Sequence, residues 1–139
     1  MYYTAFITFI FLIYNYMSAE QIHFFLHLRD QLKLYHWQTH VYSRHVATDK
    51  HLKKLEKSID SYVEIYIGKY GRPKISGKNS LITIHNLSEA GATRMIVAAV
   101  KYLQGPLSKT LNTSDTDLIN IRDEIIADLN QLLYLFTLH

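Results

Sequence analysis

Apolar residues recur every three to four positions through most of this chain, and this period limits the possible folds more than any other feature. Such spacing lines one side of an α-helix with apolar side chains, whereas a half-buried strand needs them at every second position. The chain shows no obvious alternating run, and it has only two prolines and five glycines among 139 residues. We therefore expect an all-α protein with one domain and a core of its own.

Two helices are predicted in the first half of the domain. The first covers about residues 18–39, because Ser18 and Gln21 have the spacing of a capping box. The second covers about residues 41–68 and ends before Gly71-Arg72-Pro73, since proline lacks a backbone donor and disfavours helix at the residue before it. Their apolar stripes are Ile22, Phe25, Leu28, Leu32 and Tyr35, then Leu52, Leu55, Ile59, Val63 and Tyr66.

Two further helices are predicted in the second half. After a brief polar connection, in which we predict no helix, a shorter helix opens at Asn86, with Glu89 three residues on, and ends at Gly105-Pro106. The last helix begins within residues 113–117, where acidic side chains suit a positive helix N-terminus. Its stripe is Leu118, Ile121, Ile125, Leu129, Leu132 and Phe136. Four apolar-striped helices predict a four-helix bundle.

Residues 1–16 carry no charge and are treated apart from the domain, which we assign to residues 17–139. They are shorter than the roughly 20 residues that a spanning helix needs. They also lack the basic residues that open a secretory signal. We interpret Met17 as the natural start and the apolar extension as non-native. Two alternatives remain open, an anchor that touches a membrane and an additional packing segment, although a membrane partner is not the expectation that we favour.

Cysteine is absent, so a transition metal would have to be held by imidazole and carboxylate, which suits iron, manganese or zinc. The net charge of +3 is too small to imply a nucleic-acid partner by itself. Its distribution is uneven, because residues 44–78 hold nine Lys or Arg against four Asp or Glu. Within that stretch Lys50, Lys53, Lys54 and Lys57 make one basic helix face that could contact DNA.

The most informative stretch is Tyr35-His36-Trp37 followed by His45. Nine residues turn an unbroken helix by about 900°, so His36 and His45 would then point in opposite directions. They can share a metal only if the helix breaks between them. Residues 39–43 are the plausible place, because Thr, Val and Ser are weak helix formers. Trp37 taken alone is better explained as a core residue than as part of a site.

Downstream, His45 and Asp49 share one helix face, and so do Asp60 and Glu64. The eleven residues from Asp49 to Asp60 rise about 16 Å along a helix, too far for both pairs to bind one ion. The pairs could meet if a second copy of this helix packed antiparallel against the first. The spacing therefore predicts a site at a two-fold dimer interface, or no site.

These residues resemble a known signature. The run His36-Trp37 with His45-x3-Asp49-x10-Asp60-x3-Glu64 is similar to the pattern of the Dps-like mini-ferritins, a branch of the ferritin superfamily. The resemblance covers about residues 26–71 and, less closely, residues 128–136. Tyr35-His36-Trp37-Gln38-Thr39 and Gly68-Lys69-Tyr70-Gly71-Arg72-Pro73 also resemble ferritin-like proteins of giant DNA viruses.

The resemblance implies a ferritin-like four-helix bundle that oxidises and stores iron, and so limits oxidative damage. His36, His45 and Asp49 of one subunit and Asp60 and Glu64 of its mate would be the catalytic ligands of a non-haem mono-iron or di-iron site, with Trp37 beside it. The oxidant would be peroxide or dioxygen, and the oligomer a two-fold dimer or a dodecameric cage in the cytoplasm or a virion. The gap from His36 to His45 is shorter than the family's.

Other interpretations stay open. A structural or DNA-packaging protein could keep the bundle and lack the metal, and a membrane-associated protein would use residues 1–16. Glu20, His23 and His27 also share a helix face, which we interpret as a polar face rather than a ligand set. If a cage forms, Asp115 and Asp117 are candidates for an iron entry path, although helix capping explains them equally well.

Overall fold

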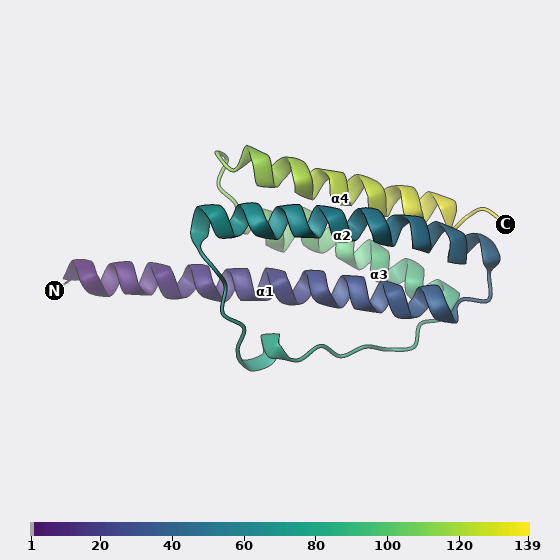
Figure 1. Ribbon diagram of the computed structural model, residues 1–139, viewed down its shortest axis with the longest axis horizontal. Helices are drawn as coiled ribbons and strands as arrows, with labels where there is room; N and C mark the ends of the chain where they lie inside the picture. The colour runs from purple at the N-terminus through teal and green to yellow at the C-terminus, as the bar shows by residue number, and fades with distance from the viewer. Residues whose placement is uncertain (1) are drawn as a thin grey trace.

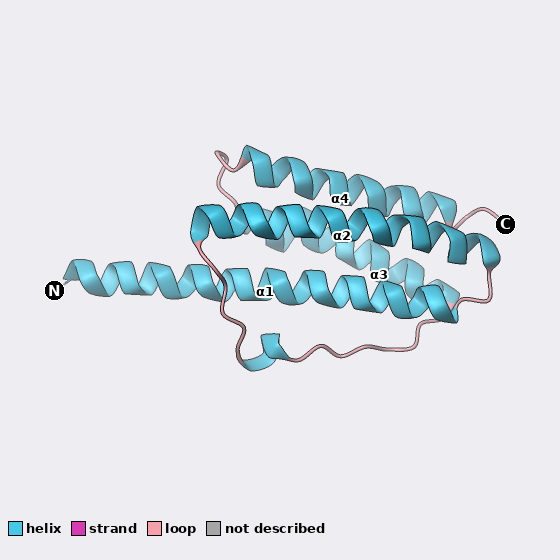
Figure 2. Ribbon diagram, in the orientation of Figure 1, coloured by secondary structure: helices cyan, strands magenta, loops and turns pink. Residues whose placement is uncertain are grey.

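The computed structural model describes the backbone of residues 2–139 and the side chains of residues 2–10 and 18–139. The described chain is all-helical and contains no strand (Figure 2). Its α-helices are α1 (Tyr2–Gln38), α2 (Tyr42–Tyr70), α3 (Glu89–Tyr102) and α4 (Thr116–Leu135), which lie side by side (Figure 1). The prediction of an all-α protein is confirmed.

The predicted apolar stripes face one another in a single core. Fully or almost fully buried members of the stripes are Phe25, Leu28, Leu32, Tyr35, Leu52, Leu55, Tyr66, Leu118, Ile125, Leu129, Leu132 and Phe136. Ile22, Ile59, Val63 and Ile121 lie at the margins and are only half-buried. Burying one such side chain stabilises the fold by about 1.5–3 kcal/mol, so the helical period of the sequence supplies the driving force for this packing.

The first helix starts earlier than predicted. α1 already includes Tyr2 and passes through Ser18 without interruption, and Ser18 is buried. An N-cap satisfies amide groups that have no partner at a helix start, and a helix that is already formed has no such groups. The capping-box prediction at Ser18 is therefore wrong.

The N-terminal part of α1 projects beyond the other helices (Figure 1). The side chains of residues 2–9 are all exposed, so the alternative that they pack onto the domain is wrong for these residues. The side chains of residues 11–17 lie outside the described part. Within the described residues, no helix has the length and apolar character required to cross a membrane.

The connection from α2 to α3 determines the topology. α1 and α2 are antiparallel, and residues 71–88 then run back along α1, so that α3 starts beside the beginning of α2 (Figure 1). α2 and α3 are consequently parallel, and α4 returns antiparallel to both. The connection includes a short 3₁₀ helix, Gly77–Ser80, where we predicted none. Gly71 begins it with φ +89°, a conformation that L side chains rarely adopt.

The predicted bounds of the third helix are wrong at both ends. Ser88, not Asn86, is the N-cap, and its hydroxyl accepts a hydrogen bond from the Gly91 amide at 3.0 Å. At the other end the chain stays helical through Gly105-Pro106, as a π-helical turn (Leu103–Leu107) followed by a 3₁₀ turn (Ser108–Thr110). A wider turn makes room for a proline ring that would clash with the carbonyl of an ordinary α-helix.

Candidate metal centre

The break between α1 and α2 is present where it was predicted. α1 ends at Gln38, and Val41 precedes α2 with extended backbone angles, φ −95° and ψ 109°. The Thr39 hydroxyl accepts a hydrogen bond from the Val41 amide at 3.1 Å, a local bond that competes with helical pairing. The chain reverses here without glycine or proline, and the reversal brings the last turn of α1 against the first turn of α2.

This reversal places His36 and His45 face to face. Their ring centroids are 4.1 Å apart, and the ring planes differ by 16°. Each Nδ1 bonds the backbone carbonyl of the other residue, at 3.0 Å from His36 and 2.9 Å from His45. The His36 Nδ1 also lies 2.9 Å from the Thr48 hydroxyl. On one unbroken helix the two rings would have faced opposite ways, so the pair depends on the turn.

The reciprocal bonds determine which nitrogen of each ring carries the proton. A carbonyl oxygen can only accept, so Nδ1 is the donor in both rings and Nε2 carries the lone pair. Neither Nε2 forms a hydrogen bond with another described residue. Metal-binding histidines are commonly held in this way, with the second nitrogen donating to a backbone carbonyl. The arrangement therefore suits two imidazole ligands.

The charge state of His36 also suits metal binding. Its side chain is buried, and this burial, together with the neighbouring His45 ring, lowers the pKa of His36 below its usual 6.5. His36 is accordingly neutral near pH 7, which is the form that binds a metal. His45 is exposed and gives the pair an open side.

Asp49 lies one turn beyond His45 on the same side of α2. Its carboxylate pairs with Lys53 at 2.9 Å. The hydrogen bond from Lys53 holds the pKa of Asp49 below its usual range, and the nearby His36 ring acts in the same direction. The structure thus brings His36, at the end of α1, near His45 and Asp49, at the start of α2.

Asp60 and Glu64 are also exposed on α2, but they are remote from this group. Along the helix Asp60 lies about 16 Å beyond Asp49. Neither carboxylate forms an ion pair with any side chain that the structure describes. Across residues 2–10 and 18–139, no group of three or more His, Asp or Glu is arranged to hold a metal ion. One chain therefore presents two separated parts of the predicted ligand set.

Trp37, the residue after His36, is not a core residue. Its side chain is 67% exposed, and the Lys33 ammonium lies 5.4 Å from the centroid of its ring. The interpretation of Trp37 as core is wrong, because the helix period turns it away from the buried Tyr35. Trp37 follows His36 in the last turn of α1, and its role as a neighbour of a metal site stays a prediction.

The predicted basic face is exposed on α2, but it is partly neutralised. Lys53 pairs with Asp49, and Lys54 lies 3.4 Å from Asp128 of α4. Lys50 and Lys57 are exposed and form no ion pair with the described residues. Only part of the basic face is therefore free to contact a nucleic-acid phosphate.

Two histidines of the polar face on α1 hold the connection in place. The Nε2 atoms of His23 and His27 contact the carbonyls of Leu81 and Thr83 at 2.7 and 3.0 Å. One turn further, the Gln31 amide bonds the carbonyl and the amide of His85 at 2.6 and 2.9 Å. Four residues of a helix rise about 6 Å, which is close to the length of two residues of extended chain. The side chains of His23, His27 and Gln31 therefore meet every second residue of the connection, and we call this set of bonds the α1 ladder. We did not predict it from the sequence.

Two polar clusters connect the ends of the helices, and we predicted neither from the sequence. At one end the Glu89 carboxylate accepts hydrogen bonds from Tyr35 and Thr39, and Arg44 bonds the Glu89 and Phe136 carbonyls at 2.8 and 3.2 Å. Burial alone would raise the pKa of Glu89, but the hydrogen bonds from Tyr35 and Thr39 outweigh it and lower the pKa.

At the other end Asp115 is the central acceptor. The Asp115 carboxylate bonds Lys69 at 2.6 Å, the Tyr70 hydroxyl at 2.7 Å and the Asn112 amide at 2.9 Å. Only 1% of Asp115 is exposed, and Asp117 also pairs with Lys69, at 2.9 Å. These bonds connect α2 with the start of α4. The suggestion that Asp115 lines an iron entry path is therefore wrong for this chain, because its oxygens are buried and paired.

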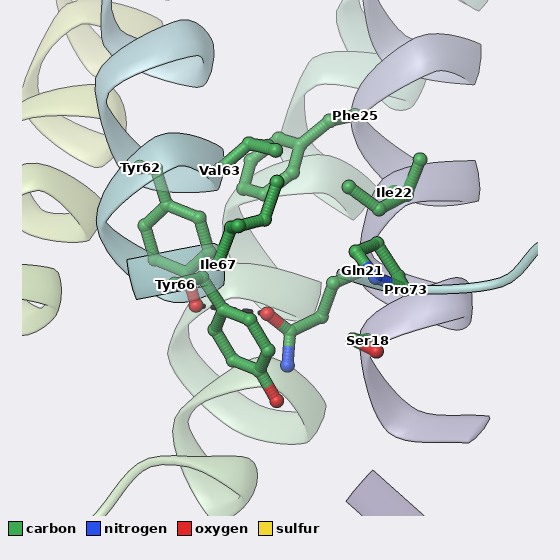
Figure 3. Close-up of a pocket in the computed structure, with 9 residues that line it drawn as sticks. All are labelled: Ser18, Gln21, Ile22, Phe25, Tyr62, Val63, Tyr66, Ile67 and Pro73. Atoms are coloured by element: carbon green, nitrogen blue, oxygen red, sulfur yellow. Dashed lines mark hydrogen bonds between the residues drawn. The ribbon is translucent and has the colours of Figure 1, made fainter. Parts of the chain in front are cut away.

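A small pocket between α1 and α2 is not a metal site. It is lined by Ser18, Gln21, Ile22, Phe25, Tyr62, Val63, Tyr66, Ile67 and Pro73 (Figure 3). The Tyr62 hydroxyl donates to the Gln21 side chain at 2.9 Å, and Gln21 donates to Thr110 at 2.7 Å. The pocket has room for about one water molecule. The interior offers no charged ligand here.

Comparison with known proteins adds one finding. A family model described as "Family of unknown function (DUF5856)" matches residues 36–136, which is more than half of the chain. The match begins at His36, so it includes the histidine pair, the carboxylates of α2 and the whole of α3 and α4. No curated protein and no solved structure shows significant similarity to the chain.

Proposed function

We propose that this chain, which belongs to the DUF5856 family of unknown function, is a ferritin-like protein that binds and oxidises iron at a site shared by two subunits. The observation that carries the proposal is the His36–His45 pair. The two rings stack 4.1 Å apart, and each Nδ1 donates to a backbone carbonyl. Such bonds orient metal ligands and make Nε2 more basic.

The topology supports the proposal as well. Ferritin-like folds are four-helix bundles with one long crossover connection, and here residues 71–88 cross from the end of α2 to the start of α3. The resemblance of the α2 residues to Dps-like mini-ferritins agrees with this topology. The topology thus supports the proposal that the four helices form a ferritin-like four-helix bundle.

A second copy would complete the ligand set. If the α2 helices of two subunits pack antiparallel around a two-fold axis, Asp60 and Glu64 of one approach the histidines and Asp49 of the other. The axis then generates two equivalent sites. Exposure of Asp60 and Glu64, without ion pairs among the described residues, leaves both carboxylates available for this role.

The proposed chemistry treats Fe(II) as the substrate. Neutral imidazole and carboxylate form the mixed nitrogen and oxygen site that suits iron. Two Fe(II) ions give up one electron each, and one peroxide molecule takes both electrons and two protons to form two water molecules. The carboxylates stabilise the greater charge of the product Fe(III). Lys53, now paired with Asp49, would have to leave that carboxylate when iron binds.

The first test compares peroxide-driven Fe(II) oxidation by the wild-type chain and by Asp60→Ala/Glu64→Ala. We expect the double variant to lose at least about tenfold in rate, because two of the charged ligands are removed. Asp123→Ala/Glu124→Ala on α4 is the matched control, since it removes the same charge from another exposed face. Oxidation by the wild type no faster than in buffer would contradict the proposal.

Mixing two inactive variants tests whether the site is shared. His45→Ala and Asp60→Ala/Glu64→Ala subunits, mixed and allowed to exchange, form heterodimers in which one of the two sites has all its ligands. An equal mixture should recover about a quarter of the wild-type rate, because half of the dimers are mixed and half of their sites are intact. A site within one chain would show no recovery.

A metal-free protein that binds DNA is the alternative. Lys50 and Lys57, exposed and without ion pairs among the described residues, are the positions that favour it. If iron is neither bound nor oxidised, DNA affinity should be measured against salt concentration. A steep fall with salt that Lys50→Ser/Lys57→Ser reduces would favour this alternative.

A further inference from the structure

The projecting part of α1 is apolar and uncovered. Tyr2 and Tyr3 are 91% and 84% exposed, and Phe6, Ile7 and Phe9 are each 62% exposed. Around the helix these positions span about 160°, with Thr4 and Thr8 on the opposite side, so a single partner helix, which covers a narrower stripe, would leave some of them in water. A wide apolar face opposite a small polar one is typical of a helix that lies in a membrane interface.

A basic loop lies at the base of this projection. Pro73 lines the pocket with Ser18 and Ile22, so the loop contacts α1 next to the point where the described side chains resume (Figure 3). Arg72 and Lys74 flank Pro73 and are exposed. Neither forms an ion pair with a described side chain, whereas the neighbouring Lys69 is neutralised by Asp115 and Asp117.

The acidic residue nearest this place along α1 does not cancel the charge. Glu20 is two residues from Ser18, which puts it on the opposite side of the helix from the residues that meet Pro73. On that side burial raises the pKa of Tyr102 of α3 to about 12, and the charge of Glu20 adds to the rise. Lys78, in the short 3₁₀ helix after Pro73, is exposed and extends the basic loop.

We propose that this end of the molecule docks on an anionic lipid surface, with the projecting apolar segment (residues 2–10) entering the boundary between headgroups and acyl chains and the basic loop (Arg72, Lys74 and Lys78) binding the headgroups. Burial of an apolar helix to about 5–10 Å combined with basic residues is a recurrent mode of membrane-surface binding. Tyrosine suits this boundary because its ring is apolar and its hydroxyl polar.

The helix can enter this boundary without leaving its polar groups unpaired. Helical backbone groups satisfy one another, and the Thr8 hydroxyl donates to the Thr4 carbonyl at 2.7 Å. From Ser18 to Tyr2 the helix is about 24 Å long. A tilted helix of this length can bury its apolar residues to a depth of about 5–10 Å, but it is too short to cross the roughly 30 Å of a bilayer core. This agrees with the absence of a spanning helix among the described residues.

Charge favours a lipid surface over the other occupants. A second copy that paired with this segment in parallel would bring Arg72 and Lys74 against the same two cations. A nucleic acid would match the cations but would give no cover to Phe6 and Phe9. An anionic bilayer satisfies both the cations and the apolar side chains. This inference is independent of the proposed iron chemistry.

The test is flotation of the full chain with vesicles of phosphatidylcholine, with and without phosphatidylglycerol. We expect binding that requires the anionic lipid and weakens in high salt. Phe6→Ser/Phe9→Ser should lower the partition constant by about tenfold for each ring removed. Arg72→Ser/Lys74→Ser should lower it by about fivefold for each charge removed. Both pairs are exposed, so helix content by circular dichroism should stay unchanged.

Lys50→Ser/Lys57→Ser is the control, because it removes two exposed, unpaired charges from the middle of α2. It should leave the partition constant within a factor of about two, as these residues are away from the docking end. Failure of the wild-type chain to float with anionic vesicles would overturn the proposal. Equal loss in the control variant would do so too. Oligomers that Phe6→Ser/Phe9→Ser disperses, without vesicle binding, would assign the segment to a second copy instead.

Discussion

Buried charged residues at the helix ends connect elements that the apolar core alone would not align. Asp115 is almost fully buried and receives bonds from Lys69, Tyr70 and Asn112. Burial would raise the pKa of Asp115, but the hydrogen bonds from Lys69 and Tyr70 outweigh it and hold the pKa below its usual value. A charge in this position is stable because its partners are fixed by α2 and by the turn before α4.

Replacing Asp115 by asparagine should therefore be costly. Asp115→Asn keeps the size of the side chain but leaves Lys69 with only Asp117, and we expect a loss of about 2–4 kcal/mol in the free energy of unfolding, measured with urea. Asp123→Asn is the control. The Asp123 side chain is exposed, so its ion pair with Arg122 should contribute less than about 1 kcal/mol to the free energy of unfolding. Similar losses in both variants would contradict the role given to Asp115.

His36 provides a second prediction at the scale of one residue. Its pKa is lowered by burial and by His45, so the unfolded chain binds a proton more readily than the folded chain in the interval below pH 6.5. The stability contributed by neutral His36 should be complete above that pH and should be lost as pH falls through the interval. Nitrogen NMR of labelled histidine would give the pKa and would show whether the proton lies on Nδ1. Titration at or above 6.5, or a proton on Nε2, would contradict the description of the pair.

At the scale of elements, the connection from α2 to α3 depends on side chains of α1 rather than on its own sequence. His23, His27 and Gln31 are spaced by four residues, and they reach backbone groups of residues 81, 83 and 85. The length of four residues in the helix and the length of two residues in the extended chain agree within about 1 Å. The connection is consequently held along α1 without forming a strand.

Removing two members of this ladder should loosen the connection and leave the helices intact. For His27→Ala/Gln31→Ala we expect the His85 amide to exchange at least about tenfold faster with solvent, because its acceptor is lost. The free energy of unfolding should fall by about 1–3 kcal/mol, as two to three hydrogen bonds are removed. Asn130→Ala, an exposed substitution on α4, is the control for both measurements. Unchanged exchange at His85 would show that the ladder does not hold the segment.

The two proposed surfaces use different parts of the whole molecule. The His36–His45 pair is at the turn between α1 and α2, whereas the projecting segment is at the opposite end of α1 (Figure 1). The basic loop lies at the base of that segment, where Pro73 meets Ser18. A two-fold partner on the α1–α2 face and a lipid surface at the end of α1 would thus bind separate regions. The tests of the two proposals are independent for the same reason.

The local pattern of the sequence determined the all-α class, the identity of most core residues and the position of the break after Gln38. These features depend on side-chain period and on the weak helix propensity of residues such as Thr39 and Val41, which act within a few residues of chain. The spacing from Asp49 to Asp60 likewise excluded one ion shared by both pairs of a single chain, because the rise of a helix per residue is fixed. In each case the physical cause is local, so one sequence suffices.

Only the tertiary structure decided the contacts between distant segments. Ser18 has the spacing of a capping box with Gln21 but lies inside α1. Trp37 is exposed although its large apolar ring favours the core. The chain stays helical through Gly105-Pro106 as a π turn, where the sequence predicts the end of the helix. Three features depend on contacts between residues that no local pattern connects. They are the stacking of His36 on His45, the α1 ladder and the burial of Asp115. They form because packing of the whole chain brings donors and acceptors together, and that information is not contained in any single stretch of sequence.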